Sequence, residues 1–183
     1  MPTRGSVAQE QKKRRANHYA VAIFNFCAGA SLVATILGCA NPQTPEEFRK
    51  SYSHPAATAN LNRPLRDVAA TFQSRAPDCL SVTVRRTVPG PTYQVIDTAY
   101  KPTIVASAQR VELYLQMKYV RGVLTSVGEP EGGYYMLVAD VYPVDAKHSR
   151  MEMFGSKGDS TLGRAITGWA TGKDLGCPDM TKG

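Results

Sequence analysis

The sequence has few of the residue types that carry catalytic or metal-binding chemistry. Its 183 residues include three histidines and four cysteines. None of the histidines (His18, His54 and His148) has a second histidine or a cysteine two to four residues further on, and no CxxC pair occurs, so the common zinc-site spacings are missing. The stretch GSKGDST at 155–161 lacks the Gly-Lys-Ser/Thr ending of a P-loop. We therefore expect neither enzyme activity nor a metal or cofactor.

The sequence also lacks a concentrated basic region in its body. The net charge is +7, but residues 1–38 alone carry +4, and the remaining residues carry +3 with acidic and basic side chains interspersed. A nucleic-acid-binding surface needs clustered positive charge. The charge distribution therefore favours an ordinary solvated surface, and we expect no nucleic-acid partner.

The N-terminal region has the three zones of a segment directed to a membrane. A basic stretch, KKRRANH, precedes the apolar stretch YAVAIFNFCAGASLVATIL, and the small residue Gly38 then precedes Cys39. The basic zone stays on the cytoplasmic side, so the chain beyond is exported. Two interpretations are open. The segment is either an uncleaved signal anchor, because about 20 apolar residues span a bilayer, or a signal peptide that is removed.

The residues Ile36-Leu37-Gly38-Cys39 resemble the lipobox of bacterial lipoproteins. This resemblance implies that residues 1–38 are a cleaved signal peptide and that Cys39 carries the lipid, including palmitate. Because Ala40 and not aspartate follows Cys39, it also implies the inner leaflet of the outer membrane, facing the periplasm, over the inner membrane. Residues 39–57, with Pro42, Pro45 and Pro55, are then expected to be a flexible tether, with at most one helical turn in PEEFRKSY.

Residues 58–183 are predicted to form a single α+β domain. Apolar residues at helical spacing predict helices over 62–76, capped by Asn62 and ended by Pro77, and over 160–171, capped by Asp159 or Ser160 and closed by Gly172. Between them, alternating patterns predict about four to six antiparallel strands, with 93–100 and 103–107 as separate short strands and 110–120 as the clearest. Strands bracketed by helices indicate both helices on one sheet face, an architecture that resembles helix-grip domains.

The two cysteines of the body are expected to form a disulfide. Cys79 directly follows the first predicted helix and Cys177 the last. An exported chain reaches an oxidising compartment, where such a pair is normally oxidised. Two buried thiols are the alternative interpretation, and a zinc site is disfavoured because the CxxC pairing is missing.

The remaining polar and aromatic residues do not combine into a reaction site. His148 is expected in a solvated turn, Arg85 and Arg86 on an exposed edge strand, and Asp140 on the outward side of a strand. Seven tyrosines lie in the strand region: Tyr93, Tyr100, Tyr114, Tyr119, Tyr134, Tyr135 and Tyr142. Tyr114 should face away from Val111 and Leu113, where it either belongs to a binding surface or, as we favour, pairs across strands.

The expected function is that of a non-catalytic envelope lipoprotein, an accessory or interaction subunit with the membrane and an envelope protein as partners. The alternative is a carrier of a small apolar ligand or lipid, enclosed between sheet and helix. A carrier needs a cavity of several hundred Å³. That cavity would lie along the strand face around Leu113 and Leu115.

Overall fold

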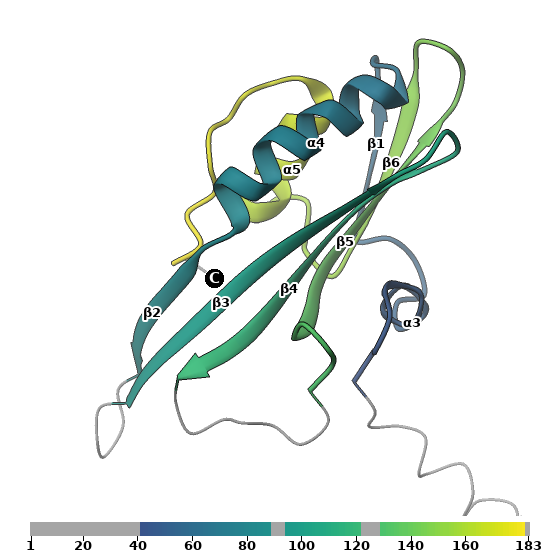
Figure 1. The fold of residues 1–183 in the computed structure, drawn as a ribbon. Coiled ribbons are helices and arrows are strands. Elements are labelled where there is room, and N and C mark those ends of the chain that lie inside the picture. The colour runs from purple at the N-terminus through teal and green to yellow at the C-terminus, as the bar shows by residue number, and fades with distance from the viewer. Residues whose placement is uncertain (1–40, 89–93, 122–128, 182–183) are drawn as a thin grey trace, which may run out of the picture. The chain divides into compact units, whose positions relative to one another are not determined.

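A computed structural model describes residues 41–88, 94–121 and 129–181. Residues 41–183 form a compact unit of their own. Within it, a six-stranded antiparallel sheet carries two long helices, α4 and α5, on one face (Figure 1). The predicted α+β class, with both helices on one face of a helix-grip-like sheet, is confirmed. With its own sheet, core and disulfide, this unit holds what it needs to fold independently.

The strands run as a meander from one edge of the sheet to the other. Their bounds are β1 Ala57–Leu61, β2 Thr83–Val88, β3 Gln94–Ala106, β4 Val111–Arg121, β5 Tyr134–Pro143 and β6 Ser149–Phe154. The spatial order is β1-β6-β5-β4-β3-β2. The chain therefore leaves β1, crosses the sheet with α4 to reach β2, and returns strand by strand until β6 lies beside β1. Strand β1 was not predicted from the sequence.

The two short strands predicted at 93–100 and 103–107 are one continuous strand, β3. Pro102 lies between the two predicted strands, and proline cannot donate a ladder hydrogen bond within a sheet. Its position in the sheet removes the conflict. The β2 register ends at Thr83 opposite Ala99, and Tyr100 N donates to Val82 O on that side. Two residues further on, the nitrogen of Pro102 faces the same side, where β2 has ended and no partner strand loses a bond.

Both predicted helices exist, and their boundaries differ most for the first. Helix α4 spans Leu65–Leu80, begins after Pro64 and continues through Pro77. Asn62 is therefore not its cap, and Pro77 does not end it. The turn after Pro77 buries Cys79 and Leu80 in the core, and this burial outweighs the lost hydrogen bond of the proline. Helix α5 spans Thr161–Thr171, with Ser160 as N-cap and Gly172 closing it at a φ of 81°, as predicted.

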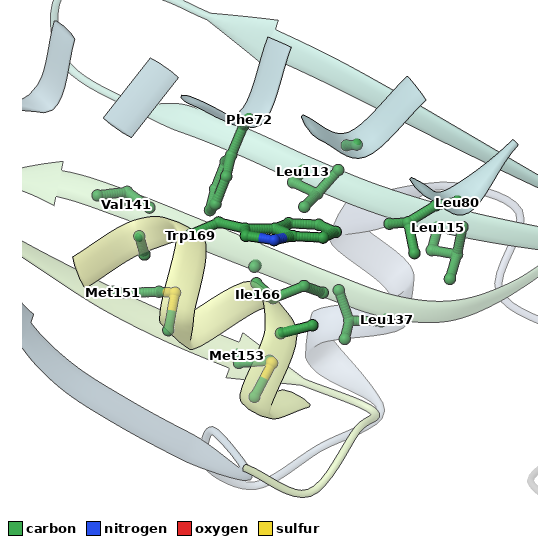
Figure 2. Packing of buried hydrophobic residues seen from close by; sticks show 14 of the residues in the cluster. Phe72, Leu80, Leu113, Leu115, Leu137, Val141, Met151, Met153, Ile166 and Trp169 are labelled. Carbon is green, nitrogen blue, oxygen red and sulfur yellow. The ribbon is translucent and has the colours of Figure 1, made fainter. Parts of the chain in front are cut away.

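The core lies between the two helices and the sheet face that they cover. Trp169 of α5 is 1% exposed and lies among Phe72 of α4, Leu113 of β4 and Ile166 of α5 (Figure 2). Leu113 and Leu115, where a carrier would have its cavity, are fully buried in this cluster. A ligand in that position would have to displace the Trp169 side chain.

Cys79 and Cys177 form the predicted disulfide, with their Cα atoms 5.0 Å apart. Cys79 lies in the last turn of α4 and not beyond the helix, as the sequence had suggested. The bond joins the end of α4 to the segment that follows α5, across a sequence separation of 98 residues. Closing a loop of this length stabilises the folded state by about 4–5 kcal/mol in the chain-entropy model.

Candidate interaction site under helix α3

The outer face of the sheet, opposite α4 and α5, is covered by a short helix where a flexible tether had been expected. Helix α3 spans Pro45–Lys50 and packs on β5 (Figure 1). Its start is well specified: Thr44 Oγ1 accepts from Glu47 N at 3.1 Å, and Glu47 Oε2 accepts from Gln43 N at 2.6 Å. The helical turn that PEEFRKSY allowed, with Pro45 at its start, is present as α3, and it packs on the sheet before residue 58.

Helix α3 closes a second, smaller apolar cluster with its Phe48 side chain. Phe48 is 6% exposed and packs with Val138 and Phe154 of the outer sheet face. The ring of Tyr135 lies 6.0 Å from that of Phe48 between centroids, and Tyr114 lies 5.7 Å from Tyr135. Aromatic pairs at these separations contribute beyond the area that they bury. Phe48 therefore anchors α3 to the sheet.

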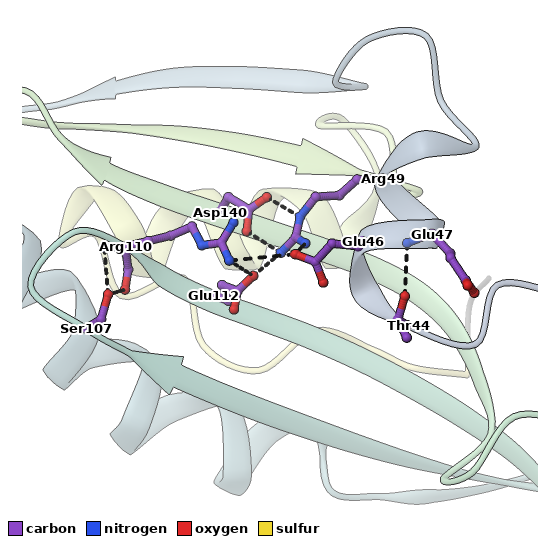
Figure 3. Close-up of polar contacts among 8 residues, drawn as sticks. All are labelled: Thr44, Glu46, Glu47, Arg49, Ser107, Arg110, Glu112 and Asp140. Atoms are coloured by element: carbon purple, nitrogen blue, oxygen red, sulfur yellow. Dashed lines mark hydrogen bonds and ion pairs between the residues drawn. The ribbon is translucent and has the colours of Figure 1, made fainter.

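The next residue, Arg49, supplies the polar half of the contact. Its Nε donates to Asp140 Oδ2 at 2.6 Å and its Nη2 to Asp140 Oδ1 at 2.8 Å, a two-pronged pair, and Nη2 also contacts Glu112 (Figure 3). The Asp140 side chain is fully buried, and the Arg49 and Glu112 side chains are 13% and 12% exposed. Arg110 Nη2 lies 2.9 Å from Glu112 Oε1 at the margin. Helix α3 thus places the Arg49 guanidinium against the carboxylates of Asp140 and Glu112.

The strand register explains why a cation is required there. Asp140 lies directly opposite Glu112 on β4 and opposite Glu152 on β6. Three carboxylates in a row across adjacent strands repel one another. Arg49 offsets this repulsion at the centre, while Arg110 and Arg150 pair with the outer two.

The protonation of Arg49 follows from these contacts. Burial alone would lower the pKa of Arg49, but the hydrogen bonds and charges of Asp140 and Glu112 hold it above its ordinary value. The site is a guanidinium clamp with its positive charge fixed.

The structure decides between the two interpretations of the tyrosines for the central ones. Tyr114 faces away from Val111 and Leu113, as predicted, and pairs with Tyr135, so cross-strand packing is its role. Tyr93 lies outside the described residues. Asp140 also faces outward as predicted, but it is buried, because α3 covers the face toward which it points.

The other polar residues singled out from the sequence have local contacts. His148 lies in the turn between β5 and β6, where its Nδ1 is 2.8 Å from Asp145 Oδ2. Arg85 pairs with Asp97 at 2.8 Å, and Arg86 Nη2 donates to Met180 O at 3.0 Å, so the adjacent arginines point apart on the edge strand β2. Cys39 and the lipobox-like residues lie outside the described residues.

A shallow hollow of about 400 Å³ lies along α4, lined by Arg63, Asp67, Ala70, Thr71, Ser74 and Arg75. One of its two arginines is already engaged. Arg63 Nη1 donates to Trp169 O at 2.9 Å and Nη2 to Thr71 Oγ1 at 3.1 Å, so this guanidinium binds the C-terminal end of α5. The Arg63 side chain therefore joins α4 to α5.

Sequence reasoning did not find the clamp, because its cation lies in the presumed tether and its acids lie on different strands. The signal present was the capped stretch TPEEFRK, with an apolar and a basic residue side by side. Comparisons with protein-family models, curated proteins and solved structures give no match. Within 41–88, 94–121 and 129–181, no helix is long and apolar enough to span a bilayer, and no three His, Cys, Asp or Glu side chains are arranged so that they could hold a metal ion.

Proposed function

We propose that this chain is a lipid-anchored lipoprotein of the bacterial cell envelope. Cys39 is its anchor, and the domain acts at the outer membrane, on the periplasmic side, as a non-catalytic accessory or interaction subunit. The observation that carries the proposal is the Cys79–Cys177 disulfide. A disulfide of this kind persists in exported proteins, and its presence agrees with an export signal ahead of the domain.

Two further observations support a role in interaction. The charged side chains of the outer face, Asp140 and Glu112, bind α3 through the Arg49 guanidinium. The inner face is filled by the Trp169 cluster. Asp140 and Glu112 on the sheet thus bind another segment of the chain, helix α3, through Arg49.

The anchor is tested by replacing Cys39 with serine in the full chain and following lipid labelling, cleavage and fractionation in a Gram-negative host. We expect Cys39→Ser to lose labelled palmitate and to accumulate as the uncleaved precursor. Cys27→Ser, which changes the other cysteine of the leader, is the matched control and should be processed normally. If Cys39→Ser is cleaved and sorted like the parent chain, the lipoprotein assignment is wrong.

A further inference from the structure

Helix α3 is held on the sheet by side chains rather than by its backbone. The backbone hydrogen bonds around it close within the helix, such as Phe48 N to Thr44 O and Ser51 N to Glu47 O. The backbone next bonds to the sheet at Ala56 N, which donates to Met153 O at 2.8 Å. The helix therefore resembles a bound peptide: Phe48 fills the apolar part of the site, and Arg49 fills the charged part.

The length of α3 makes its docking reversible. Its six residues are far fewer than the roughly 12–15 that an isolated helix needs in water. The docked state therefore depends on Phe48 and Arg49, and undocking is a local opening that leaves the sheet and the Trp169 core in place.

The outer face that α3 covers combines a polar part and an apolar part. Its polar part is the carboxylate pair of Asp140 and Glu112, which matches the two-pronged geometry of a guanidinium better than the point charge of a lysine. Its apolar part lies over Gly155, where a Cβ atom would come within 2.7 Å of the Phe48 ring and closer still to the backbone oxygen of Met136. The absence of a side chain at this position makes room for both the β5 backbone and an aromatic ring next to the guanidinium.

We propose that this outer-face site, formed by Glu112, Tyr135, Val138, Asp140 and Phe154, is a docking site for an arginine-bearing segment of an envelope protein, with an aromatic residue directly before the arginine. Helix α3 occupies the site in the free protein as an intramolecular competitor. The proposal rests on the proposed function as an interaction subunit and names the chemistry of the partner. Charge complementarity and the seated Phe48-Arg49 pair select this occupant.

The test uses a fluorescent peptide with the sequence of residues 41–54 and the domain 41–183. In the Arg49→Ala domain the competing guanidinium is gone, and we expect the peptide to bind at least about tenfold more tightly than to the unmodified domain, a difference of about 1.4 kcal/mol. Changing the peptide arginine to lysine, or adding Asp140→Asn to the domain, should remove this binding. Asp145→Asn, which neutralises an exposed turn carboxylate, is the matched control and should leave binding unchanged.

A second format keeps the proposal testable if Arg49→Ala does not fold. A protease site is inserted between Ser53 and His54 of the unmodified domain and cut after folding, so that α3 becomes a separable ligand. Labelled peptide should then replace α3, and the lysine peptide should not. Equal uptake of both peptides, no uptake, or dimers that form by exchange of α3 between copies would overturn the proposal. Neither format uses the anchor, so the outcome is independent of the Cys39 experiment.

Discussion

Removing the Arg49 side chain should destabilise the domain by about 2–3 kcal/mol. Two routes are open to the Arg49→Ala variant. If α3 stays docked, the fully buried Asp140 loses its cation, and breaking a buried pair in this way costs about 3–5 kcal/mol. If α3 undocks, water reaches Asp140, but the burial of Phe48 is lost, about 2–3 kcal/mol. The less costly route sets the result.

The measurement is urea unfolding of residues 41–183, followed by the fluorescence of Trp169, with the disulfide intact. Arg150→Ala is the matched control: its side chain is 52% exposed and pairs with Glu152 at 2.9 Å, so its loss should cost less than about 1 kcal/mol. Combining Arg49→Ala with Asp140→Asn gives a double-mutant cycle, in which we expect a coupling of at least about 1 kcal/mol. A coupling near zero, or an Arg49→Ala cost no greater than that of the control, would refute the assignment of Arg49 as the partner of a buried carboxylate.

Three further predictions concern the disulfide, the seat of Phe48 and a turn. Replacing both Cys79 and Cys177 by alanine should lower the free energy of unfolding by about 4 kcal/mol. A reductant should destabilise the parent domain but not this variant. A parent domain whose stability does not change with reductant would contradict the stabilising role of the disulfide. Gly155→Ala should loosen α3, measured as faster amide exchange around Phe48, because a Cβ atom there meets both the Phe48 ring and the backbone oxygen of Met136 in β5. Gly176→Ala is the control, because Gly176 also has a positive φ but a Cβ atom there meets nothing within 4 Å. Equal effects of the two variants would point to backbone strain alone, and faster exchange in β5 without a change around Phe48 would place the clash in the sheet and not at α3. Backbone hydrogen bonds from Lys147 and the contact with His148 lower the pKa of Asp145 in the folded state, so the stability that Asp145 adds is present above about pH 4 and is lost as the pH falls through the lowered value. The difference in Tm between the parent and Asp145→Asn should therefore shrink on acidification, and a difference independent of pH would contradict this.

The features that could be predicted from sequence are those that repeat along one element. The alternation through Val111, Leu113 and Leu115 identifies a strand and its buried face, and the spacing of Leu162, Ile166 and Trp169 with Ser160 and Gly172 at the ends identifies α5. Each of these signals lies within a short window of the chain. The disulfide is the exception: it joins residues 98 positions apart, and it was predicted from the compartment and from the place of each cysteine near a helix end.

The features that could not be predicted depend on contacts between distant segments. A helical turn at α3 could be anticipated from Pro45 at its start, but its docking could not, because it depends on Asp140, 91 residues after Arg49. The burial of Asp140 likewise cannot follow from alternation, which separates two sheet faces but does not say that a helix covers the second. Pro77 and Pro102 each indicate a break when only the neighbouring residues are considered. Helix α4 continues through Pro77 because Leu80 is buried in the core, and β3 continues through Pro102 because its edge is open at that point.

The docking of α3 also controls how far the domain reaches from its proposed anchor. Thr44, where α3 is capped, follows Cys39 by five residues, and an extended chain spans at most about 3.6 Å per residue, or about 18 Å. When α3 undocks, the first fixed point becomes Ala56, whose N donates to Met153 O of β6, and the same arithmetic gives about 61 Å. A partner that displaces α3 would therefore also lengthen, more than threefold, the chain between the proposed anchor and the folded domain. Binding and the maximum distance from the membrane would then change together.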